Sequence, residues 1–525
     1  MRTAPSRPRN ITPAPGRASP RTLTVTAVAT ALALMNYTAP MVTLPAMADA
    51  FGTPSSAQAW LLNGTPLGLA ALLLVAGALA DAHGRRRVFL LGTLALGVTT
   101  VLGAFAGTTA LFTAARIAQG AASAAVLAGS LGLLAVAYPS GRDRIRATGV
   151  WGASVSGGIA LGPLLAGALS LTDWRLAYAV LGAAALATAA VGARTLAAPA
   201  EAAGAEGAGA ERPGTERPAT ERSGAERPGR DHPAGERPGR DHPAGERPAI
   251  EHPRGERPGG GDPAPERPPG GRPDLAGAAT LTLALAALLT ALTLGRDGWL
   301  RPVIGVLLLA SAAFTALFLL VERRAGRRGG NPVIDLGLLR KPAFRVSTAG
   351  ALFTGLAVIG LFSVVPALLQ RGTGMSPLAA AWLFVLWSGT SFVVALQARR
   401  LAARLSAPYQ LALGFVLSAA GVLALLGTLD SPALPWPRLI AGLVVAGAGS
   451  GLLNAALPRL AVDSVPPERA AMGSGANNTA RYIGSAAGVA LMLALSAAGP
   501  DAPLVAGAVL ALAGAGLTAA GSPRR

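Results

Sequence analysis

Arg116 is the residue of this sequence best placed to do chemistry, because it lies inside an apolar run of membrane-spanning length. It lies about six residues, hence roughly 9 Å, from the end of that run. A charge at this depth costs at least ~2–3 kcal/mol on insertion scales, so we expect a partner, a cavity or a ligand to hold it. The alternative is that the long side chain reaches back to the membrane surface.

Asn36 lies at nearly the same depth in the first apolar run, where it could hydrogen-bond to Arg116. An amide cannot carry a proton, and we find no Asp, Glu or His well inside any apolar run. Two hypotheses follow. Either protons couple through an acid at the end of a run, such as Asp49, or the charge of Arg116 attracts an anionic or zwitterionic substrate. Gln119, on the same run as Arg116, is a further polar candidate.

Other polar and aromatic side chains inside the runs are candidates for a substrate cavity. Arg481 is the second charge inside a run, and its pairing with Asp463 or with carbonyls at a helix end is as plausible as a substrate role. Phe384 and Trp387 recur at helical spacing, which favours either an aromatic pocket or, for Trp382 and Trp387, lipid-facing anchors. The cavity candidates are Tyr37, Asn63, Phe384, Trp387, Asn454, Asn478 and Arg481.

The composition assigns these residues to membrane helices. Of the 525 residues, 51% are hydrophobic and only 14% are charged, and the apolar runs are long enough to cross ~30 Å of hydrocarbon. We predict an all-α polytopic membrane protein with fourteen transmembrane helices, located in the cell membrane. Their ranges are 23–44, 59–80, 88–106, 110–137, 147–169, 176–198, 275–295, 302–321, 346–369, 378–398, 409–429, 439–460, 476–497 and 502–520.

The net charge of +19 reflects membrane topology and does not indicate a nucleic-acid surface. Basic residues cluster in short loops at 85–87, 142–146, 323–328 and 399–404. Such loops stay on the cytoplasmic side, and an even number of helices then places both termini there. A nucleic-acid face would not alternate with apolar helices in this way, whereas an anionic inner leaflet would attract these loops.

Several other chemistries are excluded. The sequence contains no cysteine, which removes disulfides, thiolate metal sites and cysteine nucleophiles. No phosphate-binding loop of the Gly-x4-Gly-Lys-Ser/Thr type occurs, so we expect neither an ATP site nor a cofactor. No nucleophile–base pair falls within the helices, and we therefore do not expect an enzyme.

A polar tract at 199–273 interrupts the helical pattern. An acid recurs every five residues over most of it, usually followed by Arg or His and then Pro. This period matches neither helix nor strand, and the prolines block helix propagation. Because the tract has almost no apolar side chains, we expect a disordered cytoplasmic linker. Its histidines, His232, His242 and His252, favour a tether over a metal site.

The sequence therefore predicts six segments. They are a disordered cytoplasmic tail at 1–22, a six-helix bundle at 23–198, the linker at 199–273, two additional helices at 274–322, a cytoplasmic connector at 323–345 and a second six-helix bundle at 346–525.

Five motifs, in order, resemble those of the major facilitator superfamily, specifically its fourteen-helix drug:proton antiporter branch. The first, Gly-x-Leu-x-Asp-x-x-Gly-Arg-Arg-Arg, joins the second and third runs, and the second, Arg-x-x-Gln-Gly, contains Arg116 and Gln119. The third lies on the fifth run, and the others lie in the connector and at 473–488. The first motif comprises Gly77, Asp81, Gly84, Arg85, Arg86 and Arg87, and the third comprises Gly158, Gly162, Pro163 and Gly167.

Two of these motifs also have a physical interpretation of their own. Gly158 and Gly162 share one helix face and let a neighbouring backbone approach closely, while Pro163 bends the helix. This predicts a seam on which two bundles can pivot. Asp81, beside three arginines at the cytoplasmic end, predicts a charge latch between helices that closes in one state and opens in the other.

The resemblance implies two six-helix halves related as repeats, a central cavity and alternating access. It also implies proton-driven export of small lipophilic compounds such as drugs or antibiotics. The family usually has Asp at the position of Asn36, coupled to the arginine at 116. This departure leaves open the export of an anionic or zwitterionic metabolite with different or no proton coupling. A transporter-like sensor or scaffold acting through the tract is the alternative from another class.

Overall fold

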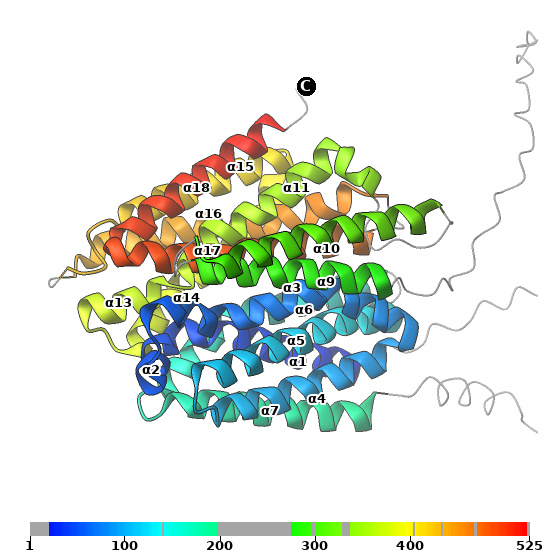
Figure 1. The fold of residues 1–525 in the computed structure, drawn as a ribbon, viewed down its shortest axis with the longest axis horizontal. Coiled ribbons are helices and arrows are strands. Elements are labelled where there is room, and N and C mark those ends of the chain that lie inside the picture. Colours follow the sequence, from blue (N-terminus) through cyan, green and yellow to red (C-terminus); the bar gives the residue numbers. More distant parts are fainter. Residues whose placement is uncertain are drawn as a thin grey trace, which may run out of the picture. The chain divides into compact units, whose positions relative to one another are not determined.

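The computed structural model describes residues 20–138, 141–196, 275–295, 300–327, 336–402, 405–431, 434–466 and 470–521, in which the regular elements are helices (Figure 1). The polar tract and its histidines lie outside these ranges. The N-half consists of α1 (Pro20–Thr38), α2 (Pro40–Phe51), the 3₁₀ turn η1 (Ser55–Ala57), α3 (Gln58–His83), α4 (Arg85–Ala104), α5 (Thr109–Ala137), α6 (Gly141–Leu169) and α7 (Trp174–Thr195).

Two additional helices and a second half follow. The additional helices are α9 (Leu275–Leu294) and α10 (Pro302–Arg327), and the 3₁₀ turn η3 (Leu336–Arg340) leads to the C-half. The C-half consists of α11 (Pro342–Phe353), the π-helical turn η4 (Thr354–Ile359), α12 (Gly360–Phe362), α13 (Val365–Thr373), α14 (Pro377–Ala402), α15 (Ala407–Ala424), α16 (Trp436–Asp463), α17 (Ala470–Leu495), η6 (Ser496–Ala498) and α18 (Asp501–Ala520).

Within the described ranges, eleven spans are long and apolar enough to cross a membrane, or twelve when α1 and α2 are taken as one bent span. The protein is therefore a multi-pass membrane protein, as the hydropathy pattern predicts. α3 and α9 coincide with two further predicted apolar runs, but neither is among these twelve spans. The number fourteen and the cytoplasmic side of the termini stay predictions.

One helix boundary differs from the prediction. α10 continues to Arg327, beyond the expected end at residue 321, so Glu322 lies in the last turns of the helix and is buried. Glu322 is therefore an acid near a helix end, as predicted, but it lies inside the helix and not after it. The reason is that an apolar run ends at its first charged residue, whereas backbone hydrogen bonding continues past it.

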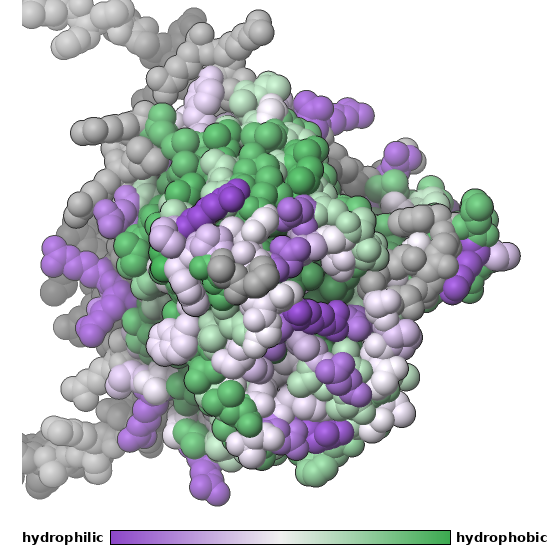
Figure 2. All heavy atoms as spheres, turned by 90° about the vertical axis from the view of Figure 1, so that its left-hand side faces the viewer, coloured by the Kyte–Doolittle hydropathy of each residue, from purple (hydrophilic) through white to green (hydrophobic). Residues whose placement is uncertain are grey.

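The helices have two chemically distinct ends. The basic end carries the Arg85–Arg87 turn and the basic residues Arg340 and Lys341. The distal end, on the left in Figure 1, carries α13 packed against α2. Figure 2 shows this distal face with polar side chains across its middle and apolar ones toward its upper edge.

The two halves meet toward the distal end. The pairs in contact include α3 with α17, α6 with α14, and α2 with both α13 and α14. In the basic half of α6, in contrast, a Cβ added at Gly149 or Gly152 would meet no atom within 4 Å. Hydrogen bonds between described residues of the two halves lie in the distal part: Tyr37 with Ser485 (3.1 Å), Asn63 to the Ala486 carbonyl (2.9 Å), Gln370 to the Val42 carbonyl (3.0 Å) and Arg371 to Gln58 (2.9 Å).

Each half contains the same glycine-mediated contact between its first and fifth helices. Gly158 and Gly162 of α6 face α1, and a Cβ added at Gly162 would lie 2.7 Å from the carbonyl oxygen of Met35. Gly484 and Gly488 of α17 face the corresponding backbone of α11 and η4. Both pairs are four residues apart, which places them on one helix face. This spacing lets the helix backbones touch.

The rest of the glycine motif on α6 faces the other half. A Cβ added at Gly167 would lie 2.9 Å from the carbonyl oxygen of Pro377, at the start of α14. Pro163 lies inside α6, between the two contacts. The motif therefore packs α6 on α1 at one end and on α14 at the other.

The additional helices lie against a contact between the halves. α9 packs on α10 and also contacts α3 and α17, one helix from each half. The Thr282 hydroxyl donates a hydrogen bond to the carbonyl of Ala71 on α3 (2.7 Å).

Replacement of Gly162 by Val should destabilise the protein by about 1–3 kcal/mol, because the added methyl groups overpack the α1–α6 contact. Heating in detergent, followed by size-exclusion chromatography, measures the fraction that stays folded. Gly152→Val is the control, since its Cβ meets open space. Equal melting temperatures for the two variants would contradict the tight seam.

Candidate functional site

Arg116 on α5 is fully buried and is held by neutral oxygen atoms. Its NH1 donates to the main-chain carbonyl of Asn36 and to Oε1 of Gln119, both at 2.7 Å. Its NH2 donates to the carbonyl of Tyr37 at 3.4 Å, and its Nε has no acceptor. In the part of the chain that the structure describes, none of these partners is an acid. The predicted intramembrane charge is therefore present and is not neutralised by a carboxylate.

A proline supplies the principal acceptor. α1 and α2 meet at an angle of 48° where Pro40 begins α2. Proline has no N–H, so in a continuous helix the carbonyl four residues earlier would lose its donor. That carbonyl belongs to Asn36, and Arg116 occupies it instead. The carbonyl freed by the helix break and the N–H of the buried guanidinium thus satisfy each other's hydrogen bond. In the membrane interior such pairing is required, because no water is available to either group.

The Asn36 side chain has a different role from the predicted one. Its Nδ2 donates to the Leu32 carbonyl (3.3 Å), and its Oδ1 accepts from the Thr100 hydroxyl (3.3 Å). Asn36 therefore contacts Arg116 through its main chain, while its amide ties α1 to α4. Gln119 links Arg116 to α4 as well, because its Nε2 donates to the carbonyl of Thr99 (3.2 Å).

Tyr37 connects this arginine to the C-half. Its carbonyl accepts from Arg116, and its hydroxyl lies 3.1 Å from the hydroxyl of Ser485 on α17. Its ring packs edge-to-face against Tyr482, with centroids 6.0 Å apart. The guanidinium carbon of Arg481 lies 5.7 Å from the Tyr482 ring centroid. The structure thus brings Arg116, Tyr37 and Arg481 together around one contact between the halves.

Arg481 is the second intramembrane charge, and its predicted pairing is absent. Among the described residues it forms neither an ion pair with Asp463 nor a hydrogen bond to a helix-end carbonyl. Its side chain is partly exposed, yet its Nε is buried without an acceptor. Asn478, one turn before it, donates to the carbonyl of Ser474 (3.1 Å).

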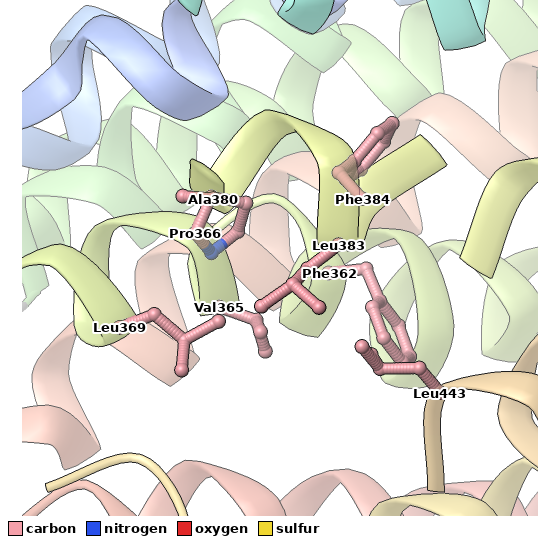
Figure 3. A pocket seen from close by; sticks show the side chains of 8 residues that line it. All are labelled: Phe362, Val365, Pro366, Leu369, Ala380, Leu383, Phe384 and Leu443. Carbon is pink, nitrogen blue, oxygen red and sulfur yellow. The ribbon is translucent and has the colours of Figure 1, made fainter. Parts of the chain in front are cut away.

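The predicted aromatic face of α14 packs inside the C-half. Trp387 stacks on Phe362 with ring centroids 4.3 Å apart and contacts Phe384. Both α14 rings are buried, which excludes a lipid-facing role for Trp387, whereas Trp382 is 59% exposed. Phe362 and Phe384 line a small apolar hollow with Leu383 (Figure 3). The Trp387 indole N–H has no acceptor among the described residues.

The remaining polar candidates lie apart from Arg116. Asn63 joins α3 to α17 and α9, donating to the Ala486 carbonyl and to Thr293 (3.4 Å). Asn454 donates to Ser391 within the C-half (3.3 Å). Asp49 is exposed near the end of α2, about 13 residues or roughly 20 Å along the helix from Asn36.

The arginine-rich turn is held within the N-half. Gly84 has φ +93°, a conformation that favours glycine, and it begins α4. Arg85 donates to the carbonyl of Gly132 (3.2 Å). Arg86 donates to two carbonyls at the end of α7, those of Leu196 (2.8 Å) and Ala193 (3.0 Å). Arg87 is exposed, Gly77 meets open space, and the Asp81 side chain lies outside the described atoms.

Sequence reasoning missed three contributors to the site, namely Pro40, Thr100 and Ser485. A signal for Pro40 was present, since a proline four residues after a polar residue in a membrane helix frees a carbonyl at a predictable depth. Thr100 and Ser485 gave no signal, because single hydroxyl residues are common in apolar helices and bond their own backbone.

The acceptor role of Pro40 can be tested by a double-mutant cycle. Arg116→Met should lower stability, because the Asn36 carbonyl is left buried without a donor, at a cost of about 1–3 kcal/mol. Pro40→Ala supplies an N–H and should recover most of this loss in the Arg116→Met background, while costing stability alone. Thermal unfolding of the four proteins in detergent measures the coupling. Additive effects would contradict the shared carbonyl.

The sequence is similar to that of known membrane transporters. The family model of the Major Facilitator Superfamily matches residues 26–252 and 275–489. The multidrug resistance protein Stp of Mycobacterium tuberculosis is 27% identical over 488 residues, covering 91% of this chain and 76% of that protein. The probable actinorhodin transporter of Streptomyces coelicolor is 28% identical over 473 residues, covering 87% and 68%. The puromycin resistance protein pur8 of Streptomyces alboniger is 28% identical over 481 residues, covering 90% and 81%.

Among solved structures, the peptide transporter POT in complex with sulfate superposes with a TM-score of 0.63 at 13% identity, covering 96% of each chain. This likeness concerns the fold alone. Because the family model matches most of the sequence, the chain belongs to the major facilitator superfamily.

Proposed function

We propose that this protein exports small, lipophilic organic compounds, including antibiotics, across the membrane by alternating access and in exchange for protons. The proposal rests on the sequence similarity of the protein, over about nine-tenths of the chain, to a multidrug resistance protein and a puromycin resistance protein. Shorter matches point the same way, to the methylenomycin A resistance protein of Bacillus subtilis and the multidrug efflux pump LfrA of Mycolicibacterium smegmatis.

The contacts between the halves support alternating access. The halves are joined by hydrogen bonds toward the distal end, while α6 glycines near the basic end have no neighbour. A rocking motion would exchange these contacts for contacts at the basic end. The glycine pairs Gly158/Gly162 and Gly484/Gly488 would stay closed within each half and serve as the rigid parts.

Proton coupling requires a group that gains and loses a proton, and the Arg116 site offers only neutral partners. We place coupling at an acid away from this site, with Asp49 as the candidate from the sequence. The alternative function is export of an anionic or zwitterionic metabolite with different or no proton coupling. One observation favours it: a buried guanidinium without a carboxylate leaves the local field positive.

Transport into inside-out vesicles with and without an imposed pH gradient decides between these functions. For a proton antiporter we expect the initial rate to fall at least about tenfold when the gradient is collapsed, because export then loses its driving force. An unchanged rate would overturn proton coupling and support the alternative. Asn36→Asp introduces a protonatable group on the residue whose main-chain carbonyl binds Arg116, and the pH dependence of its transport should exceed that of the wild type.

We also propose that the Gly77–Arg87 turn acts as a conformational latch at the basic end. Arg85 and Arg86 are anchored on carbonyls of α5 and α7, so a charge on Asp81 would act against a fixed frame. Asp81→Asn should slow turnover severalfold and leave substrate affinity largely unchanged, because the latch acts on the transition between states. Arg438→Gln, an exposed change at the distal end, is the control. Normal kcat for Asp81→Asn in reconstituted vesicles would rule out the latch.

A further inference from the structure

We infer that Arg481 and the residues around it form a recognition site for the anionic group of an aromatic substrate. The inference rests on the proposed export function and names a substrate class for it. The site comprises Asn478, Arg481, Tyr482 and Ser485 of α17, together with Tyr37 of α1, and is called the α17 anion site below.

The α17 residues share one helix face. They occupy positions i, i+3, i+4 and i+7, which line one side of a helix. Two of them reach α1 of the N-half: Ser485 through the hydroxyl of Tyr37 at 3.1 Å, and Tyr482 through its ring. The face therefore points toward the other half, between the two bundles. It does not face lipid.

The charge of Arg481 is not compensated by the protein. Across the described ranges it has no acid and no hydrogen-bond acceptor, and its Nε is buried. A guanidinium offers five N–H donors and no acceptor, and inside a membrane domain such a group normally pairs with an acid or a carbonyl. Arg116 differs because backbone carbonyls and Gln119 accept from its NH1 and NH2, although its Nε, like that of Arg481, has no acceptor among the described residues. Arg481 keeps its donors available to a ligand.

The position of Arg481 gives a ligand access. α17 runs from the basic end toward the distal end, and Arg481 precedes Ser485 by one turn, roughly 6 Å. It therefore lies on the basic side of the Tyr37–Ser485 contact. A compound that enters from the basic end reaches Arg481 before it reaches the contact that joins the halves.

The neighbours specify the class of ligand. The guanidinium fork matches a carboxylate in a bidentate geometry. Tyr37 and Tyr482 pack edge-to-face at 6.0 Å and are both buried, so an aromatic body would meet their rings when the halves separate at this contact during the proposed alternating access. The residues together fit an aromatic carboxylate or phenolate better than a bare inorganic anion, which would use the charge and leave the rings without a partner.

Two dyes with the same three-ring body and opposite charge test the assignment. Fluorescein is negatively charged at neutral pH, and rhodamine 123 is positively charged. Fluorescence anisotropy with the full-length protein in detergent should give at least about tenfold tighter binding of fluorescein. Arg481→Gln should weaken fluorescein binding about tenfold and leave rhodamine 123 binding unchanged or tighter. Arg438→Gln, at an exposed arginine of the distal end, should change neither.

Three results would overturn the inference. They are equal affinity of the wild type for the two dyes, an unchanged fluorescein affinity in Arg481→Gln, and displacement of fluorescein by sulfate at equal concentration. The last would assign the site to a bare anion. Arg481→Lys guards against misfolding of the Gln variant, since it keeps the charge and loses the fork. Its affinity for fluorescein should lie between those of the wild type and Arg481→Gln.

These outcomes are separable from those of the export proposal. If vesicles export neutral antibiotics but binding shows no preference for the anionic dye, the α17 anion site is overturned and export stands. If the anionic dye binds through Arg481 but no compound is exported, the export proposal fails and the site stands.

Discussion

The organisation of the N-half depends on one buried positive charge held without an acid. Arg116 is fully buried, and its donors bond to carbonyls of α1 and to Gln119. The insertion cost of such a charge is lowered when its donors find partners. The helix break at Pro40 provides one of these partners by freeing the carbonyl of Asn36. Charge burial and helix distortion are therefore two parts of one interaction.

This interaction extends to the contact between the halves. The carbonyl of Tyr37 accepts from Arg116, while its hydroxyl and ring contact α17. A displacement of the Arg116 guanidinium, by a ligand or by a change in helix packing, would therefore shift Tyr37 and alter its contacts with α17. The glycine contacts on α6 and α17 are rigid by comparison, because backbone packs directly on backbone and leaves no side chain to rearrange.

The sequence predicted most of the fold because membrane helices obey few rules. Every spanning backbone group must be satisfied internally, so long apolar runs become helices. Each predicted run corresponds to a helix of the structure, and the glycine pairs lie at contacts between helices. The failures are local. The bend at Pro40 and the π-turn at η4 divide two predicted helices, and α10 extends past its first charge to include Glu322.

What the sequence alone determined is the inventory: an all-helical membrane protein of the major facilitator superfamily, with two intramembrane arginines and no acid at the position of Asn36. Only the tertiary structure decided how those groups are partnered. Hydropathy fixes which residues lie in the membrane, but a hydrogen bond depends on which faces of two distant helices meet. For that reason the sequence placed Arg116 beside Asn36 without revealing that the bond is to a main-chain oxygen freed by Pro40. The sequence likewise suggested Asp463 as a partner for Arg481, whereas in the structure the guanidinium lies over the ring of Tyr482.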